Sequence, residues 1–155
     1  MNLTSYLTAP PRKNEKNERR MSLNSTLARL TSTLNNGQKA RKLEITLCNN
    51  KKISEVLSIL KTEGYIRDFF FEDNQKIRVL LKYYKDKPSI SKIEMISKNN
   101  RNNIISFKQL QLSHRLLKQQ NQGLGTFILS TSQGLLTEYD CINRNIGGCI
   151  ILRIT

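Results

Sequence analysis

Residues 53–64 have the sequence ISEVLSILKTEG, and this stretch decides the first half of the fold. Its apolar side chains recur at positions i, i+3, i+4 and i+7, the spacing that places them on one face of an α-helix. Glycine is typical of the position just after a helix. We therefore predict a helix that ends at Gly64 and buries four side chains: Ile53, Val56, Leu57 and Leu60.

The segments around this stretch predict a second helix and three strands. Residues 24–35 repeat leucine at helical spacing and precede Asn36-Gly37, a pair typical of a helix end. Residues 43–47 alternate between apolar and polar side chains, as a half-buried strand does. Residues 65–71 and 77–83 are strand-like runs on either side of a polar turn, which predicts a β-hairpin. The expected order is helix, strand, helix, strand, strand.

A second section begins at Pro88 and is predicted to be mostly β-structure. Strand-like runs cover residues 90–96 and 126–129, and residues 149–154 form a final apolar strand. The fold class is therefore α+β, built from two small modules. We expect a basic, extended N-terminal segment over residues 1–21, an α-β-α-β-β module over 22–86, and a β-rich module with one short helix over 87–155.

The short helix of the second module is predicted from its N-terminal cap. Thr137 is a good capping residue, and Asp140 stands three positions later, which approximates a capping box. We expect a helix over residues 138–144 that ends at Gly147-Gly148. The strand before it would then be separated from it by a loop.

The net charge of +14 and the pI near 10.0 favour a polyanionic partner, above all a nucleic acid. Residues 1–42 carry nine basic and two acidic side chains, and residues 85–118 carry eight and two. Residues 119–155 carry two of each and are neutral. Any nucleic-acid contact in that last quarter must therefore use hydroxyl groups, amides and shape more than charge.

Other classes of function find no support in the sequence. No apolar stretch is long enough to span a membrane, where about 18 consecutive residues are needed. The three cysteines form no C-x-x-C pair, so we expect small buried side chains and neither a disulfide framework nor a zinc site. His114 is the only histidine, and no P-loop, H-E-x-x-H or G-x-S-x-G motif occurs. We expect no enzymatic activity, no cofactor, no metal and no small-molecule substrate.

The segment Ser130-Thr131-Ser132-Gln133-Gly134 is the strongest candidate for a binding loop. It is expected between a strand and a helix, where hydroxyl groups and backbone amides can bind phosphates, ribose hydroxyls and base edges. Serine and threonine are also ordinary turn residues. The residues alone therefore leave a plain turn open as the alternative.

Five motifs in the same order resemble the family of ribosomal small-subunit protein eight. The principal one is residues 130–137, STSQGLLT, followed by Asn145-Ile146-Gly147-Gly148 and the closing strand. The others are Gly123-Leu124-Gly125, Glu63-Gly64-Tyr65-Ile66 with Asp68-Phe69, and Leu81-Lys82-Tyr83, so the resemblance covers about residues 22–155. This chain departs from the family pattern at several positions, with Gln133 in place of a lysine and Cys149 in place of a glutamate.

The resemblance implies two small α+β modules, binding to the central domain of small-subunit rRNA during assembly, and no catalysis. It also implies neighbouring small-subunit proteins as partners. One set of expected RNA-binding residues lies in the second module: Ser130, Thr131, Ser132, Gly134, Gly147 and Gly148. A second set lies on the first helix and its exit: Ser32, Asn36, Gln38 and Lys42.

Two questions of function and location stay open at this point. A free-standing RNA-binding regulator with the same fold is the alternative to a structural constituent of the ribosome. Alanine is rare, whereas asparagine, isoleucine and lysine are abundant, which is typical of an A/T-rich genome such as that of an organelle. We expect a mitochondrial location, with a plastid or a bacterial cytoplasm as alternatives.

Overall fold

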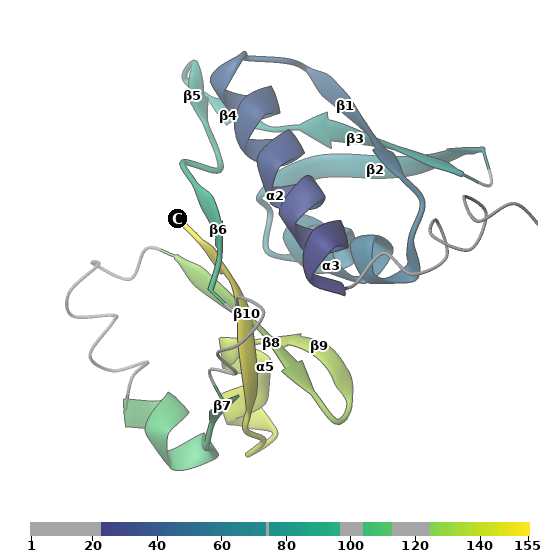
Figure 1. The fold of residues 1–155 in the computed structure, drawn as a ribbon. Helices are drawn as coiled ribbons and strands as arrows, with labels where there is room; N and C mark the ends of the chain where they lie inside the picture. Colours follow the sequence, from purple (N-terminus) through teal and green to yellow (C-terminus); the bar gives the residue numbers. More distant parts are fainter. Residues whose placement is uncertain (1–22, 74, 97–103, 113–124) are drawn as a thin grey trace, which may run out of the picture.

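The computed structural model describes residues 23–73, 75–96, 104–112 and 125–155. These residues form two larger antiparallel sheets with helices packed beside them, and a third sheet of two short strands at residues 83–88 (Figure 1). The α+β fold class is confirmed. The expected extension over residues 1–21 lies outside the described residues, and so do residues 97–103 and 113–124.

The N-terminal half has the predicted order helix, strand, helix, strand, strand. Helices α2 and α3 cover one face of a sheet in which β3 lies between β1 and β2 (Figure 1). All four side chains predicted to be buried on α3 are buried. The elements are α2 (Leu23–Lys39), β1 (Glu44–Cys48), α3 (Lys51–Thr62), β2 (Ile66–Asp73) and β3 (Lys76–Leu81).

The predicted end of the first helix at Asn36-Gly37 is wrong, because α2 continues to Lys39. A Cβ atom on Gly37 would lie 2.7 Å from Ile45 Cγ2 and 3.2 Å from Leu81 Cδ1. Gly37 therefore allows the helix to approach the sheet closely instead of terminating it. The chain leaves the helical conformation at Arg41, which has a φ of 52°.

Two predictions of burial in this half are also wrong. Leu43 precedes β1 and is 78% exposed, because the alternation of buried side chains starts only with Ile45. Cys48 is the last residue of β1, lies on the exposed side of that alternation, and is exposed. Cys149 is only half-buried, and Cys141 alone is buried as predicted; all three thiols are free.

The C-terminal half is built around β10, which pairs with three other strands. The sheet has the order β6-β10-β8-β9, and β7 also pairs with β10. A short helical segment over residues 107–112 begins with Ser106 and Gln109 as a reciprocal cap. The elements are β4 (Tyr83–Tyr84), β5 (Lys87–Pro88), β6 (Ile93–Met95), β7 (Ile104–Ile105), β8 (Thr126–Thr131), β9 (Gly134–Thr137), α5 (Glu138–Asn143) and β10 (Gly148–Ile154).

The prediction of a loop between the strand and the short helix is wrong, because a strand lies there. Strand β8 extends to Thr131, and β9 pairs with it from Gly134 onwards, so only Ser132 and Gln133 form the turn. Leu136 and Thr137 face the core, which explains why the chain pairs as a strand here. Helix α5 also ends before the expected glycines, since the chain turns at Asn145 with a φ of 55°.

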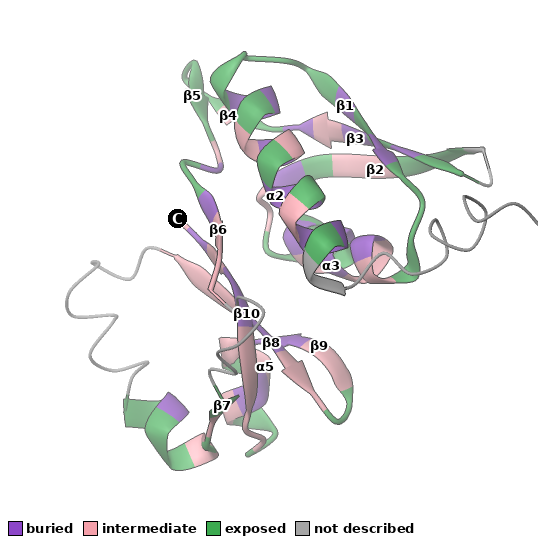
Figure 2. Cartoon of the chain, in the orientation of Figure 1, coloured by how far each residue is buried: buried purple, intermediate pink, exposed green. Residues whose placement is uncertain are grey.

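One cluster of buried side chains contains residues of both larger sheets. Figure 2 shows buried segments on elements of both halves. The Asn35 side chain accepts a hydrogen bond from the Ile93 amide at 2.9 Å and donates one to the Ile93 carbonyl oxygen at 2.8 Å. The hydroxyl groups of Tyr65 and Thr126 lie 2.8 Å apart. These bonds position β6 and β8 against the N-terminal half, while the boundary between the expected modules at residues 86 and 87 stays a prediction.

The described residues contain no helix that is long and apolar enough to cross a membrane. They also contain no group of three His, Cys, Asp or Glu side chains placed to hold a metal ion.

Candidate nucleic-acid interface

The tip of the β8–β9 hairpin is held in shape by the hydroxyl group of Thr131. This hydroxyl donates a hydrogen bond to the Gly134 carbonyl oxygen at 2.9 Å and accepts one from the Gln133 amide at 3.1 Å. Gly134 has a φ of 107°, a conformation that suits glycine. The hydroxyl of Thr131 is thus used inside the hairpin, where it fixes the backbone of the turn.

The hydroxyl groups of Ser130 and Ser132 are available for an external partner. Ser132 is exposed and Ser130 is half-buried, and within the described part of the chain neither side chain forms a hydrogen bond. A hydroxyl group can both donate and accept, so each can bind a phosphate oxygen, a ribose hydroxyl or a base edge. They flank Thr131 on a backbone fixed by sheet pairing, because Ser130 pairs with Leu135 and with Cys149.

Gly148 allows the start of β10 to lie directly against this hairpin, and Gly147 lies equally close to β7. A Cβ atom on Gly148 would lie 2.7 Å from the Ser130 carbonyl oxygen and 3.0 Å from Thr131 Cγ2. A Cβ atom on Gly147 would lie 2.6 Å from the Ile105 carbonyl oxygen. Distances to backbone oxygens this short leave no room for a side chain. The structure therefore brings the six predicted residues of the second module together at one surface.

Helix α5 returns from the hairpin strand β9 toward the hairpin tip. Its first turn is capped as predicted, since the Thr137 hydroxyl accepts a hydrogen bond from the Asp140 amide at 3.1 Å. Arg144 follows the helix, and its Nη1 atom donates a hydrogen bond to Gln133 Oε1 at 3.1 Å. Sequence reasoning missed Arg144 because its contact depends on where α5 points, and no motif or spacing marks it.

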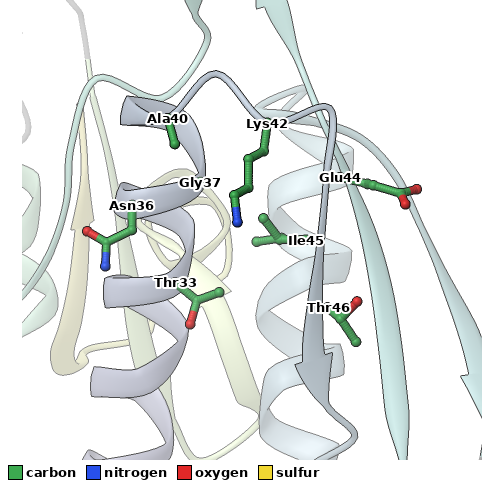
Figure 3. A pocket seen from close by; sticks show the side chains of 8 residues that line it. All are labelled: Thr33, Asn36, Gly37, Ala40, Lys42, Glu44, Ile45 and Thr46. Atoms are coloured by element: carbon green, nitrogen blue, oxygen red, sulfur yellow. The ribbon is translucent and has the colours of Figure 1, made fainter.

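The second predicted set is partly gathered along a groove of about 480 Å³ between α2 and β1 (Figure 3). Asn36 and Lys42 line it, and the Lys42 side chain points into the space between the helix and the strand (Figure 3). The Tyr83 hydroxyl donates a hydrogen bond to the Lys42 carbonyl oxygen at 2.6 Å, which fixes the backbone there, and burial raises the pKa of Tyr83. The groove is lined by Thr33, Asn36, Gly37, Ala40, Lys42, Glu44, Ile45 and Thr46.

The other two residues of that set lie outside the lining of the groove. Ser32 is exposed on α2. Gln38 is only 3% exposed, and neither its Nε2 nor its Oε1 has a hydrogen-bond partner among the described residues. The structure thus presents Ser32, Asn36 and Lys42 at the surface, while Gln38 is inside.

Charged side chains on the N-terminal sheet pair with one another and with helix α3. Arg78 donates to Glu72 and its Nη1 lies 3.7 Å from Glu44 Oε2, and the bond to Glu72 raises the pKa of Arg78. Lys61 Nζ lies 2.6 Å from Asp68 Oδ1, and this hydrogen bond lowers the pKa of Asp68. This part of the surface therefore offers less free charge than its composition suggests.

Comparison with known proteins gives one family. A sequence model of the family "Ribosomal protein S8" matches residues 25–154. The small ribosomal subunit protein uS8m of Acanthamoeba castellanii is 36% identical over 130 residues, which cover 84% of this chain and 98% of that protein. The small ribosomal subunit protein uS8 of Legionella pneumophila is 34% identical over 138 residues, and that of Buchnera aphidicola is 31% identical over 137 residues. Those alignments cover 86% and 87% of this chain, and 99% and 100% of the relatives.

Proposed function

This chain belongs to the ribosomal protein S8 family, and from that premise we propose that it is a structural constituent of the small ribosomal subunit. Within that role, it binds the central domain of small-subunit rRNA and supports assembly of the subunit. The family is structural and not enzymatic, and so this chain is not an enzyme. Its partners are small-subunit rRNA and neighbouring small-subunit proteins.

The hairpin tip is the observation that carries this proposal. The hydroxyl groups of Ser130 and Ser132 have no hydrogen-bond partner among the described residues, and their backbone is fixed by sheet pairing and by the Thr131 hydroxyl. Sequence-specific RNA contacts need such fixed donors and acceptors, because base edges are recognised by geometry. The basic blocks elsewhere in the chain supply the attraction to phosphates that does not depend on sequence.

A second contact lies on the N-terminal half. Ser32, Asn36 and Lys42 are exposed or line the groove between α2 and β1, so they can bind the RNA backbone with hydroxyl, amide and ammonium groups. The Gln38 side chain is buried, so it would have to turn outward to contact RNA. The two contacts correspond to the proposed modules, residues 22–86 and 87–155.

The mitochondrial ribosome is the proposed location. The A/T-rich composition supports it, and so does the similarity to a relative named uS8m. Bacterial relatives have comparable identity, so a bacterial cytoplasm is one alternative location. A plastid is the other alternative. Fractionation of the source cells, followed by detection of the chain with the small ribosomal subunits of one compartment, decides between them.

The main experiment measures binding of the full chain to a central-domain rRNA fragment from its own source, with Ser130 and Ser132 both changed to alanine. Each lost hydrogen bond costs about 0.5–1.5 kcal/mol, so the double variant should bind roughly 5- to 150-fold more weakly. The matched control is Ser54→Ala with Ser58→Ala, because both hydroxyls donate to backbone oxygens within α3. The control should bind as the parent does.

Equal binding by the parent and the hairpin variant across salt concentrations would refute the hairpin tip as a reading element. Sedimentation tests the wider role. A structural constituent sediments with small subunits at moderate salt, whereas a free-standing regulator stays mainly in the free fraction.

A further inference from the structure

Arg144 stands at the hairpin tip although it is 11 positions away from Gln133 in the sequence. Its backbone amide donates to the Asp140 and Ile142 carbonyl oxygens, which fixes the end of α5. Its side chain then reaches Gln133 Oε1 at 3.1 Å, and both residues are exposed. The guanidinium group therefore contacts Gln133, the turn residue that follows Ser132, although it comes from the end of a different element.

Among the described residues, the charge of Arg144 has no carboxylate partner. A guanidinium group has five N–H donors, and the bond to Gln133 uses one of them. In residues 23–73, 75–96, 104–112 and 125–155, no carboxylate forms an ion pair with Arg144, although Asp140 lies one turn earlier in α5. Residues 125–155 contain one other basic residue, Arg153, and that side chain lies 6.0 Å from the Phe127 ring centre.

We propose that Arg144 binds an RNA phosphate at the hairpin tip and that Gln133 positions it for this contact; the inference rests on the proposed function. The fork of the guanidinium group matches two oxygens of one phosphate. Ser132 can donate its hydroxyl proton to the same or the adjacent phosphate. Within residues 125–155, Arg144 thus brings a cation without a described carboxylate partner to the turn that carries Ser132.

The test measures binding of the full chain to the central-domain rRNA fragment as a function of salt concentration. A phosphate contact releases a counterion, so Arg144→Gln should reduce the slope of log K against log salt by about one. Affinity at moderate salt should fall roughly tenfold, as expected for a charged hydrogen bond. The control is Arg67→Gln, which removes the same charge from an exposed arginine on β2 and should change neither the slope nor the affinity.

Two further variants separate charge from positioning. Arg144→Lys keeps the slope but loses affinity severalfold, because an ammonium group lacks the fork. Gln133→Ala also keeps the slope, since the charge remains, and loses affinity severalfold because Arg144 is no longer held. If Gln133→Ala binds as the parent does, Gln133 does not position Arg144.

An unchanged slope in Arg144→Gln, or an equal fall in Arg67→Gln, overturns the role of Arg144. If the Ser130 and Ser132 double variant still binds weakly in that case, the proposed function stands and only this inference fails. If the parent itself shows no preference for the central-domain fragment over an unrelated RNA of equal length, the proposed function fails, and this inference with it.

Discussion

The N-terminal sheet and the tip of the β8–β9 hairpin differ in whether their polar side chains have partners within the described residues. On the sheet, Arg78 contacts two carboxylates, and Asp68 lies 2.6 Å from Lys61 of helix α3. At the hairpin tip, in contrast, the hydroxyls of Ser130 and Ser132 have no partner among the described residues. In the N-terminal half, α2 and α3 also pack buried apolar side chains into the core.

This difference suggests that the residues that stabilise the fold and the residues proposed to bind RNA lie in different parts of the molecule. Exposed groups that already pair with each other gain little from a new partner, because an existing bond must first be broken. Groups held in place without a partner lose little when they bind, since their geometry is already fixed. We therefore expect stability to depend on the buried apolar core, and the proposed RNA recognition to depend on the hairpin tip.

The largest expected effect is a loss of stability from a change in the buried core. Leu57→Ala removes a fully buried side chain of α3 and should cost about 2–5 kcal/mol of unfolding free energy in urea. The control is Leu112→Ala, because Leu112 is 61% exposed and its loss should stay within roughly 0.5 kcal/mol. RNA affinity of the molecules that remain folded should match the parent, and a lower value would show that the two regions are coupled.

A second change acts at the hairpin tip itself. In Gly148→Ala the new methyl group would lie 2.7 Å from the Ser130 carbonyl oxygen, so the hairpin and β10 must move apart. We expect a loss of about 1–3 kcal/mol in stability and, unlike in Leu57→Ala, weaker RNA binding by the folded protein. Urea unfolding and rRNA binding on the same samples check both. Unchanged RNA affinity would mean that the close approach of β10 does not position the tip.

A smaller effect is expected at the cap of α5. Thr137→Ala removes the acceptor for the Asp140 amide and should destabilise the protein by about 1 kcal/mol in urea unfolding. Because α5 carries Arg144, RNA affinity should also fall slightly. Thr62→Ala at the end of α3 is the matched control, since it removes a threonine hydroxyl bound to the Ser58 carbonyl oxygen and leaves RNA affinity unchanged. Equal effects of the two variants on RNA affinity would argue against a role for α5.

The smallest effect concerns acid stability of the N-terminal sheet. The hydrogen bond from Lys61 lowers the pKa of Asp68 below its ordinary value, so the pair stabilises the folded chain at a pH above that ordinary value and loses this contribution as the pH falls through the folded pKa. Asp68→Asn should therefore lose less stability than the parent when the solution is acidified through this range, measured by urea unfolding at several pH values. RNA affinity at neutral pH should stay the same, and an identical acid slope in parent and variant would show that the pair contributes nothing.

Helices and strands that bury one clear face were predictable from the sequence. The face of α3 and the hairpin of β2 and β3 follow from the spacing of apolar side chains, because burial selects that spacing locally. Strand β9 was missed because its residues lack such a spacing. It has only four residues, and Leu135 and Leu136 are adjacent, so no alternation marks it.

Glycines show the limit of sequence reasoning most directly. Asn36-Gly37 has the composition of a helix end, yet Gly37 lies inside α2 because Ile45 and Leu81 occupy the space where its side chain would be. Such contacts join residues that are distant in the chain. A local pattern therefore cannot separate a glycine needed for a turn from one needed for close packing.

The sequence by itself determined the fold class, the family and the identity of the candidate hairpin residues, because these follow from local spacing, composition and ordered motifs. The tertiary structure alone decided which groups are free to bind. It placed Gln38 inside, used the Thr131 hydroxyl within the turn, and brought Arg144 beside Gln133. The physical reason is that hydrogen bonding and burial depend on the neighbours that folding supplies, which a one-dimensional pattern does not contain.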